Sequence, residues 1–136
     1  MKKRNRILAL VFVVILAVSL LSTLALAAVP DIQVYGKETV VRVNTDKKPW
    51  YALLTNPKVK ITNTGDCTMH IFIDGPKAKT VYLTSNRKHN NSTTIKLEPN
   101  SSYTIYIDNS PYHYNINGVV SAQNYIQSMK GTWIMH

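Results

Sequence analysis

Residues 58–74, KVKITNTGDCTMHIFID, carry the clearest folding signal in the chain. On both sides of Asn-Thr-Gly-Asp, apolar side chains occupy every second position: Val59, Ile61, Cys67, Met69, Ile71 and Ile73. Successive side chains of a β-strand point to opposite faces, so this period predicts two strands that each bury one face. The glycine-containing loop between them predicts that the two strands form a β-hairpin.

The same two-residue period recurs along the chain. It occurs at residues 38–44, 79–84, 93–98, 102–109 and 112–118, and residues 124–136 have room for one or two more short strands. Turns rich in Gly, Pro and Asn separate these segments, and none has the apolar spacing of an amphipathic helix. About seven to eight short strands predict an all-β fold, a single antiparallel β-sandwich.

The N-terminus has the composition of a secretory signal peptide. Four cations in the first six residues precede an uncharged run over residues 7–29, and Ala25-Leu26-Ala27 is a small-x-small site. This order predicts cleavage between Ala27 and Ala28. An uncleaved membrane anchor stays open, because a run of 23 residues is long enough to cross a bilayer once.

The expected organisation follows from that reading. Residues 1–27 are the signal peptide, residues 28–37 a lead-in segment, and residues 38–136 the sandwich domain. The short, lysine-rich start is typical of bacterial export signals. We therefore expect a bacterial protein that is secreted or held on the extracellular face of the cell envelope.

Charge and cysteine content narrow the possible partners. Four of the 16 Lys and Arg residues belong to the signal peptide, so the other 12 against 7 Asp and Glu leave a net charge of +5. That surplus suits anionic surfaces, but it lacks the clustered stripe of a nucleic-acid binder. Cys67 has no cysteine partner within the chain. We expect a buried small hydrophobe there, with an intermolecular disulfide as the alternative.

The sequence lacks the motifs of common enzymes. It contains no nucleotide-binding glycine loop, nucleophile elbow or zinc-protease motif. Cys67 and His70 have the spacing of a metal pair, but an odd spacing on a strand sends them to opposite faces. We therefore predict a protein that is not an enzyme, with no catalytic residue, no metal site and no cofactor.

Two stretches resemble extracellular modules. Residues 97–107, LEPNSSYTIYI, resemble the part of fibronectin type III and related Ig-like domains that holds the tyrosine corner. In that motif a Leu-x-Pro precedes a strand whose early tyrosine, here Tyr103, bonds back to the backbone. Residues 59–66, VKITNTGD, are similar to a hairpin of bacterial surface Ig-like repeats. The resemblance covers 19 of 136 residues and implies an Ig-like fold class without an active site.

Aromatic side chains suggest where a ligand binds. Flat rings beside hydroxyl and amide groups suit sugar rings or protein partners, whereas cross-strand aromatic pairs can also serve only to stabilise a sheet. Alternation predicts that Tyr82 and Tyr106 share one outward face with Thr80 and Thr104. The candidate binding surface comprises Trp50, Tyr51, Tyr82, Tyr106, Tyr112 and Tyr114.

These observations favour one function and leave another open. The leading hypothesis is an exported, non-enzymatic β-sandwich that binds a cell-wall polymer, a glycan or a surface protein, and no nucleic acid. It would touch a membrane only through an uncleaved N-terminal segment. The alternative is a small secreted antibacterial or membrane-active toxin. The basic, aromatic composition suggests that alternative, although no strongly amphipathic helix supports it.

Overall fold

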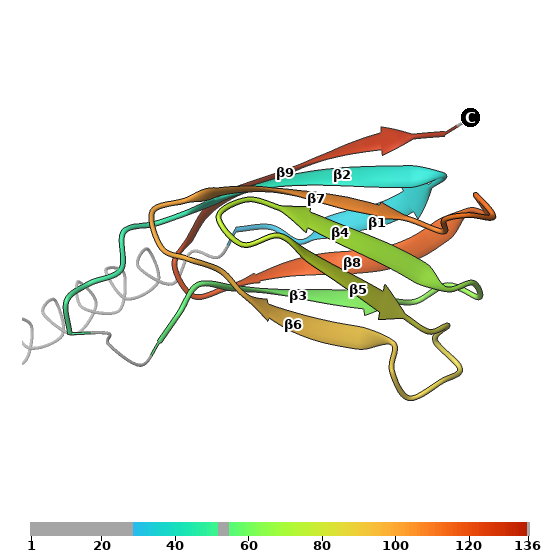
Figure 1. Cartoon of the computed structure of the whole chain (residues 1–136), viewed down its shortest axis with the longest axis horizontal. Coiled ribbons are helices and arrows are strands. Elements are labelled where there is room, and N and C mark those ends of the chain that lie inside the picture. Colours follow the sequence, from blue (N-terminus) through green and yellow to red (C-terminus); the bar gives the residue numbers. More distant parts are fainter. Residues whose placement is uncertain (1–28, 52–54, 136) are drawn as a thin grey trace, which may run out of the picture.

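The computed structural model describes residues 29–51 and 55–135, and in them it contains strands and no helix (Figure 1). None of this part could therefore span a bilayer as a helix. The predicted signal peptide and its predicted cleavage site at Ala27 and Ala28 lie outside the described residues. The strands are β1 (Ile32–Gly36), β2 (Glu38–Thr45), β3 (Lys58–Asn63), β4 (Met69–Asp74), β5 (Lys79–Leu83), β6 (Ser92–Lys96), β7 (Ser102–Asp108), β8 (Ile116–Gln123) and β9 (Ile126–Ile134).

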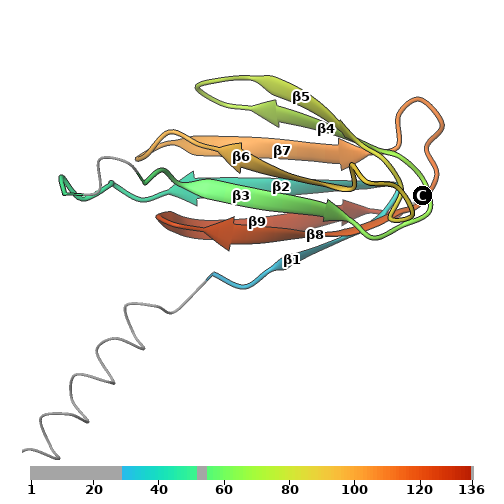
Figure 2. The same ribbon diagram turned by 90° about the horizontal axis from the view of Figure 1, so that it is seen from below.

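The strands form two antiparallel sheets that pack face to face. One sheet has the order β1-β8-β3-β6 and the other the order β5-β4-β7-β2-β9. Every pairing is antiparallel. Strands of both sheets run along the same long direction in Figures 1 and 2, as in an aligned sandwich. The predicted all-β sandwich is confirmed.

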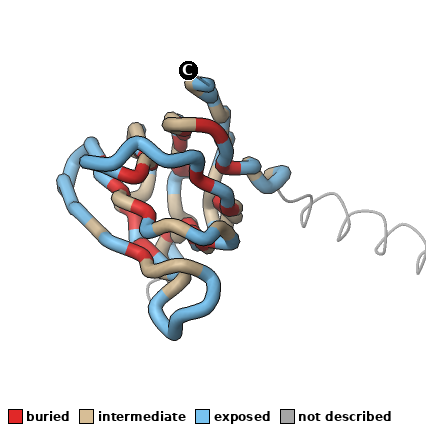
Figure 3. Tube along the Cα trace, turned by 90° about the vertical axis from the view of Figure 1, so that its right-hand side faces the viewer, coloured by how far each residue is buried: buried red, intermediate tan, exposed pale blue. Residues whose placement is uncertain are grey.

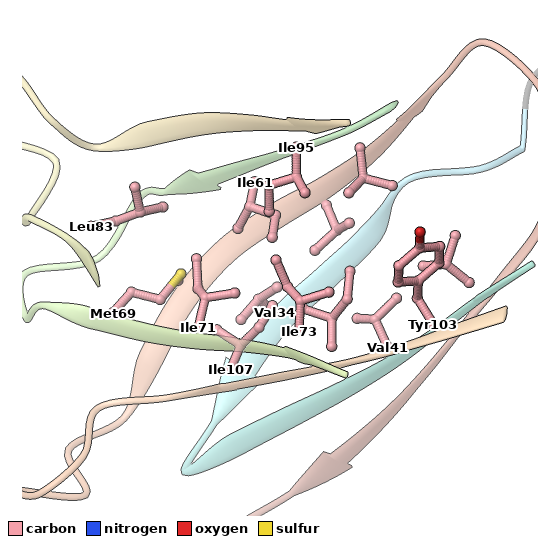
Figure 4. Close-up of a cluster of buried hydrophobic side chains, with 14 of the residues drawn as sticks. Val34, Val41, Ile61, Met69, Ile71, Ile73, Leu83, Ile95, Tyr103 and Ile107 are labelled. Carbon is pink, nitrogen blue, oxygen red and sulfur yellow. The ribbon is translucent and has the colours of Figure 1, made fainter. Parts of the chain in front are cut away.

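The core lies between the sheets and draws on both (Figure 4). Buried and exposed positions alternate along the strands (Figure 3). The two-residue period therefore identified the inward faces of β2, β3, β4 and β7 correctly. Their inward side chains are Thr39, Val41, Val43, Val59, Ile61, Met69, Ile71, Ile73, Tyr103, Ile105 and Ile107.

The predicted hairpin over residues 58–74 is wrong. Strand β3 pairs with β6 and β8, whereas β4 pairs with β5 and β7 in the other sheet. The connection over residues 64–68 therefore crosses between the sheets. Two strands that face one core from opposite sheets show the same alternation as two strands of a hairpin, so the period could not separate the two cases.

Three boundaries also differ from the sequence prediction. Residues 28–37 are more than a lead-in, because they contain β1, which pairs with β8 and buries Val34. The strand predicted over residues 112–118 begins only at Ile116 and continues to Gln123 as β8. Residues 124–136 hold one long strand, β9, at the edge beside β2.

The predicted tyrosine corner is present at the start of β7. The ring of Tyr103 is buried, and its hydroxyl accepts a hydrogen bond from the backbone N–H of Glu98 at 2.7 Å. This bond ties the turn between β6 and β7 to the core. The likeness to fibronectin type III and Ig-like domains is local to this turn.

Candidate functional site

A pocket of about 920 Å³ opens at the end of the sandwich where β3 passes to β4 and β7 passes to β8. We call it the end pocket. Its wall is a mixture of aromatic rings and uncharged polar groups, with few ionisable side chains. The rings are those of Tyr35, Tyr112 and Tyr114, and the polar side chains are Thr64, Asp66, Thr68, Asn109, Asn115 and Asn117.

A buried asparagine shapes the wall formed by residues 64–68. The side chain of Asn63, 1% exposed, donates from Nδ2 to the carbonyl oxygens of Cys67 and Thr84, both at 2.8 Å. Its Oδ1 accepts from the backbone N–H of Gly65 at 3.0 Å. Because one shielded amide satisfies three backbone groups, it fixes the path of this loop.

A second buried asparagine holds the opposite wall, residues 109–115. Nδ2 of Asn109 donates to the carbonyl oxygen of Thr68 at 2.5 Å and to its hydroxyl at 3.1 Å. Oδ1 of Asn109 accepts from the backbone N–H of Tyr114 at 3.3 Å. The peptide bond between Ser110 and Pro111 is cis. Asn109 thus joins the two walls.

The rings of the end pocket lie in stacked pairs. Tyr112 and Tyr114 stack with ring centroids 5.9 Å apart and planes 9° from parallel, and they are 66% and 60% exposed. Tyr35 stacks on Trp133 at 5.0 Å, and the indole N–H of Trp133 donates to the carbonyl oxygen of Gln33 at 2.6 Å. A ligand that stacks on these rings would bind side chains that are already held in place, so little conformational entropy would be lost on binding.

Cys67 was predicted to be a buried side chain of a strand, but it lies in a loop, is only half-buried and lines the end pocket. It is half-buried in the loop before β4, where its thiol lies 3.3 Å from the carbonyl oxygen of Asn115. Burial raises the pKa of the Cys67 thiol, and the negative charge of Asp66 raises it further. A thiol kept protonated in this way is a poor nucleophile at neutral pH.

We expect Cys67 to react with iodoacetamide more slowly in the folded chain than in the urea-unfolded chain, from neutral to alkaline pH. The raised pKa lowers the thiolate fraction of the fold, so the rate should reach half its maximum at a higher pH in the folded state. Mass spectrometry of the alkylated chain against time gives both rates. A folded-state midpoint at or below the unfolded one would contradict this assignment.

The predicted binding surface divides among three places. Trp50 and Tyr51 are highly exposed and belong to the connection between β2 and β3. Figure 1 shows this connection leaving the sandwich at the end opposite the β3–β4 and β7–β8 loops, which form the end pocket. Tyr82 and Tyr106 lie on the outer face of the five-stranded sheet, as the alternation predicted. The stacked tyrosines of the end pocket are the remaining two. The structure does not bring all six rings together.

Between Tyr82 and Tyr106 lie side chains that the sequence reading had not selected. Tyr82 contacts the ring of His70, and Tyr106 stacks on Phe72. His70 Nδ1 lies 3.2 Å from a carboxylate oxygen of Asp108. His70 is thus on the sheet face while Cys67 lines the pocket, and no three described His, Cys, Asp or Glu residues lie close enough to hold a metal ion.

Comparisons with protein-family models, with curated proteins and with solved structures find no match for this chain. The likeness of the tyrosine corner therefore adds nothing about a ligand. The function has to be inferred from the chemistry of the end pocket and of the sheet face.

Proposed function

We propose that this chain is an exported, non-enzymatic β-sandwich that binds a glycan of the cell envelope or its surroundings in the end pocket. The supporting observation is the exposed, stacked pair Tyr112 and Tyr114 beside side-chain amides and hydroxyls. A sugar has an apolar face of C–H groups and a rim of hydroxyls. The rings can cover that face, while Asn115, Asn117 and Thr64 donate to and accept from the rim.

The charge of the pocket wall points to a neutral sugar. Among the described residues that line the end pocket, Asp66 is the one carboxylate, and none is a lysine, arginine or histidine. The guanidinium of Arg87 does not line the pocket and lies 3.8 Å from the carboxylate of Asp66, so it offsets that negative charge and leaves the wall close to neutral. The net charge of +5 over residues 28–136 would attract the anionic polymers that surround such sugars, and salt would screen that attraction.

The same wall supports binding more than hydrolysis. Glycosidases of the usual type place two carboxyl groups on either side of the scissile bond, and this wall supplies Asp66 alone. The neighbouring thiol, Cys67, has a raised pKa, and its hydrogen-bond partner is the carbonyl oxygen of Asn115, which cannot take up its proton. The proposal is accordingly a binding module.

Tyr112→Ala and Tyr114→Ala are each expected to weaken glycan binding about tenfold, the equivalent of about 1.4 kcal/mol. Each substitution removes an exposed ring and breaks up the stacked pair. Binding is measured by co-sedimentation with purified cell-wall polysaccharide at low and at high salt. Tyr51→Ala, which removes an equally exposed ring at the opposite end, is the matched control and should bind like wild type.

Salt separates this proposal from simple charge attraction. Binding that survives high salt and falls with either pocket tyrosine supports a glycan site. Binding that disappears with salt in every variant would mean that only the net charge acts. Binding that is unchanged in both pocket variants would overturn the proposal.

A further inference from the structure

The outer face of the five-stranded sheet has exposed apolar side chains at its centre. The strand registers place Phe72, Tyr106 and Val40 next to one another on β4, β7 and β2. Phe72 and Tyr106 are each 38% exposed, with ring centroids 6.2 Å apart. We call these three residues the central row. Exposed rings at the middle of a sheet face, with polar groups around them, are typical of an interaction surface.

Charged side chains flank the central row in a regular way. Arg42 on β2 and Asp74 on β4 lie on one side of the central row, each two residues along its strand from the row. Glu38 on β2 and His70 on β4 lie two residues away on the other side. No ion pair joins Arg42 or Glu38 to any other residue in the described ranges. On β2, therefore, Arg42 and Glu38 carry opposite charges on the two sides of the row. On β4 the carboxylate of Asp74 stands across the row from the imidazole of His70, a polar group that can donate a hydrogen bond to it.

We propose that this face pairs with the same face of a second copy of the chain, about a two-fold axis that runs along the central row. Such an axis reverses the strand direction of the second copy, so the two flanks of the row change places. Arg42 then faces Glu38 of the second copy. Asp74 faces His70 of the second copy, and the rings of the two central rows meet at the axis.

The remaining facing pairs are compatible with this arrangement. Thr104 comes opposite Asp108, and Lys130 comes opposite Ile134, so no two like charges meet. A surface whose charges are opposite in sign about its own centre is complementary to itself. That property favours a second copy over an unrelated partner.

The size of the face sets the expected strength. Five strands spaced about 4.8 Å apart, over about five residues each, present roughly 400 Å² per copy. This is about half the area of a standard-size interface, so we expect a weak dimer with a Kd in the micromolar range or above. The end pocket lies beyond the Glu38 flank, so a dimer would present two pockets at opposite ends, outside the interface.

Sedimentation velocity tests the proposal. The full chain is expressed, and the form that the expressing cell exports is purified for the measurement. Reductant is present so that a Cys67 disulfide cannot link two copies. The wild type should shift from monomer to dimer as its concentration rises from micromolar towards millimolar. Arg42→Glu and Glu38→Arg should each weaken association about tenfold or more, because each places like charges opposite one another.

The combined variant Arg42→Glu/Glu38→Arg should regain the wild-type association, since it restores opposite charges across the axis. Lys60→Glu, a charge reversal on the outer face of the other sheet, should leave association unchanged. A wild type that stays monomeric throughout would overturn the proposal. So would single variants that still dimerise, or a combined variant that does not recover. Circular dichroism shows that each variant is folded.

Discussion

Asn63→Ala is expected to destabilise the domain by about 3 kcal/mol, because it removes the buried amide that satisfies three backbone groups. The carbonyl oxygens of Cys67 and Thr84 lose their donor, and the backbone N–H of Gly65 loses its acceptor. A buried polar group left without a partner costs about 1–3 kcal/mol, and alanine offers no substitute. The loop of residues 64–68 should lose its fixed path as well.

Urea unfolding at equilibrium measures the change, and a parallel thermal scan should show Tm lower by roughly 10–20 °C. Asn44→Ala is the matched control. Asn44 also makes two side-chain hydrogen bonds, with Ser128 and Ser102, but they are exposed to water. Its loss should therefore cost no more than about 0.5–1 kcal/mol. Equal losses for the two variants would mean that Asn63 does not hold the loop.

The sequence predicted which residues face inward far better than which strands pair. Val59 and Ile61 on β3 and Ile71 and Ile73 on β4 are buried as expected, because burial of alternate positions depends only on strand geometry. Strand pairing depends instead on whether each loop returns the chain to the same sheet or carries it to the other one. The loop after Asn63 leads across the sandwich, through hydrogen bonds to residues that are distant in sequence, and no local period records such bonds.

The tyrosine corner was predictable for the opposite reason. Its hydrogen bond joins Glu98 and Tyr103, only five residues apart, so a short motif specifies both the turn and the ring that fastens it. Local motifs of this kind can be recognised in a single sequence. They predict the conformation of one turn and say little about the rest of the domain.

The candidate site was only partly predictable. Tyr112 and Tyr114 were selected as exposed rings, yet their alternation was mistaken for a strand, since rings in a loop can mimic the period of a buried face. Asn109, which shapes that loop, looks like an ordinary turn residue in the sequence. Phe72 was overlooked because it stands at an outward position of β4, where a polar residue is expected.

The second half of strand β8, after Gly118, was missed, and Gly118 also gives the second large prediction. Gly118 weakens the strand signal in the sequence, because glycine is depleted in strands. In the structure it is a buried position of β8, between β1 and β3. A Cβ atom there would overlap the carbonyl oxygen of Thr62 and would lie 3.0 Å from Cε of Met69. The strand is possible at this point only without a side chain.

Gly118→Ala is therefore expected to cost about 3 kcal/mol or more, or to prevent folding. The obstacle is a backbone atom of β3, which pairs with β8, so relief would require the two central strands of the sheet to separate. Urea unfolding of the purified chain, or its loss from the soluble fraction, reports the effect.

Gly131→Ala is the informative comparison, because there the new Cβ would lie 2.6 Å from Cγ2 of Ile32, a side-chain atom, whereas at Gly118 the obstacle is backbone. Gly131 is on β9, an edge strand that can shift more easily than a central one, and we expect a loss of about 1–2 kcal/mol, smaller than at Gly118. A Gly118→Ala variant as stable as Gly131→Ala would mean that β3 and β8 can move apart at low cost. The end pocket would then also be less rigid. Thr64 and Asn117 line it, and the backbone hydrogen bond between them, from Thr64 N–H to the carbonyl oxygen of Asn117, lies next to the β3–β8 contact at Gly118.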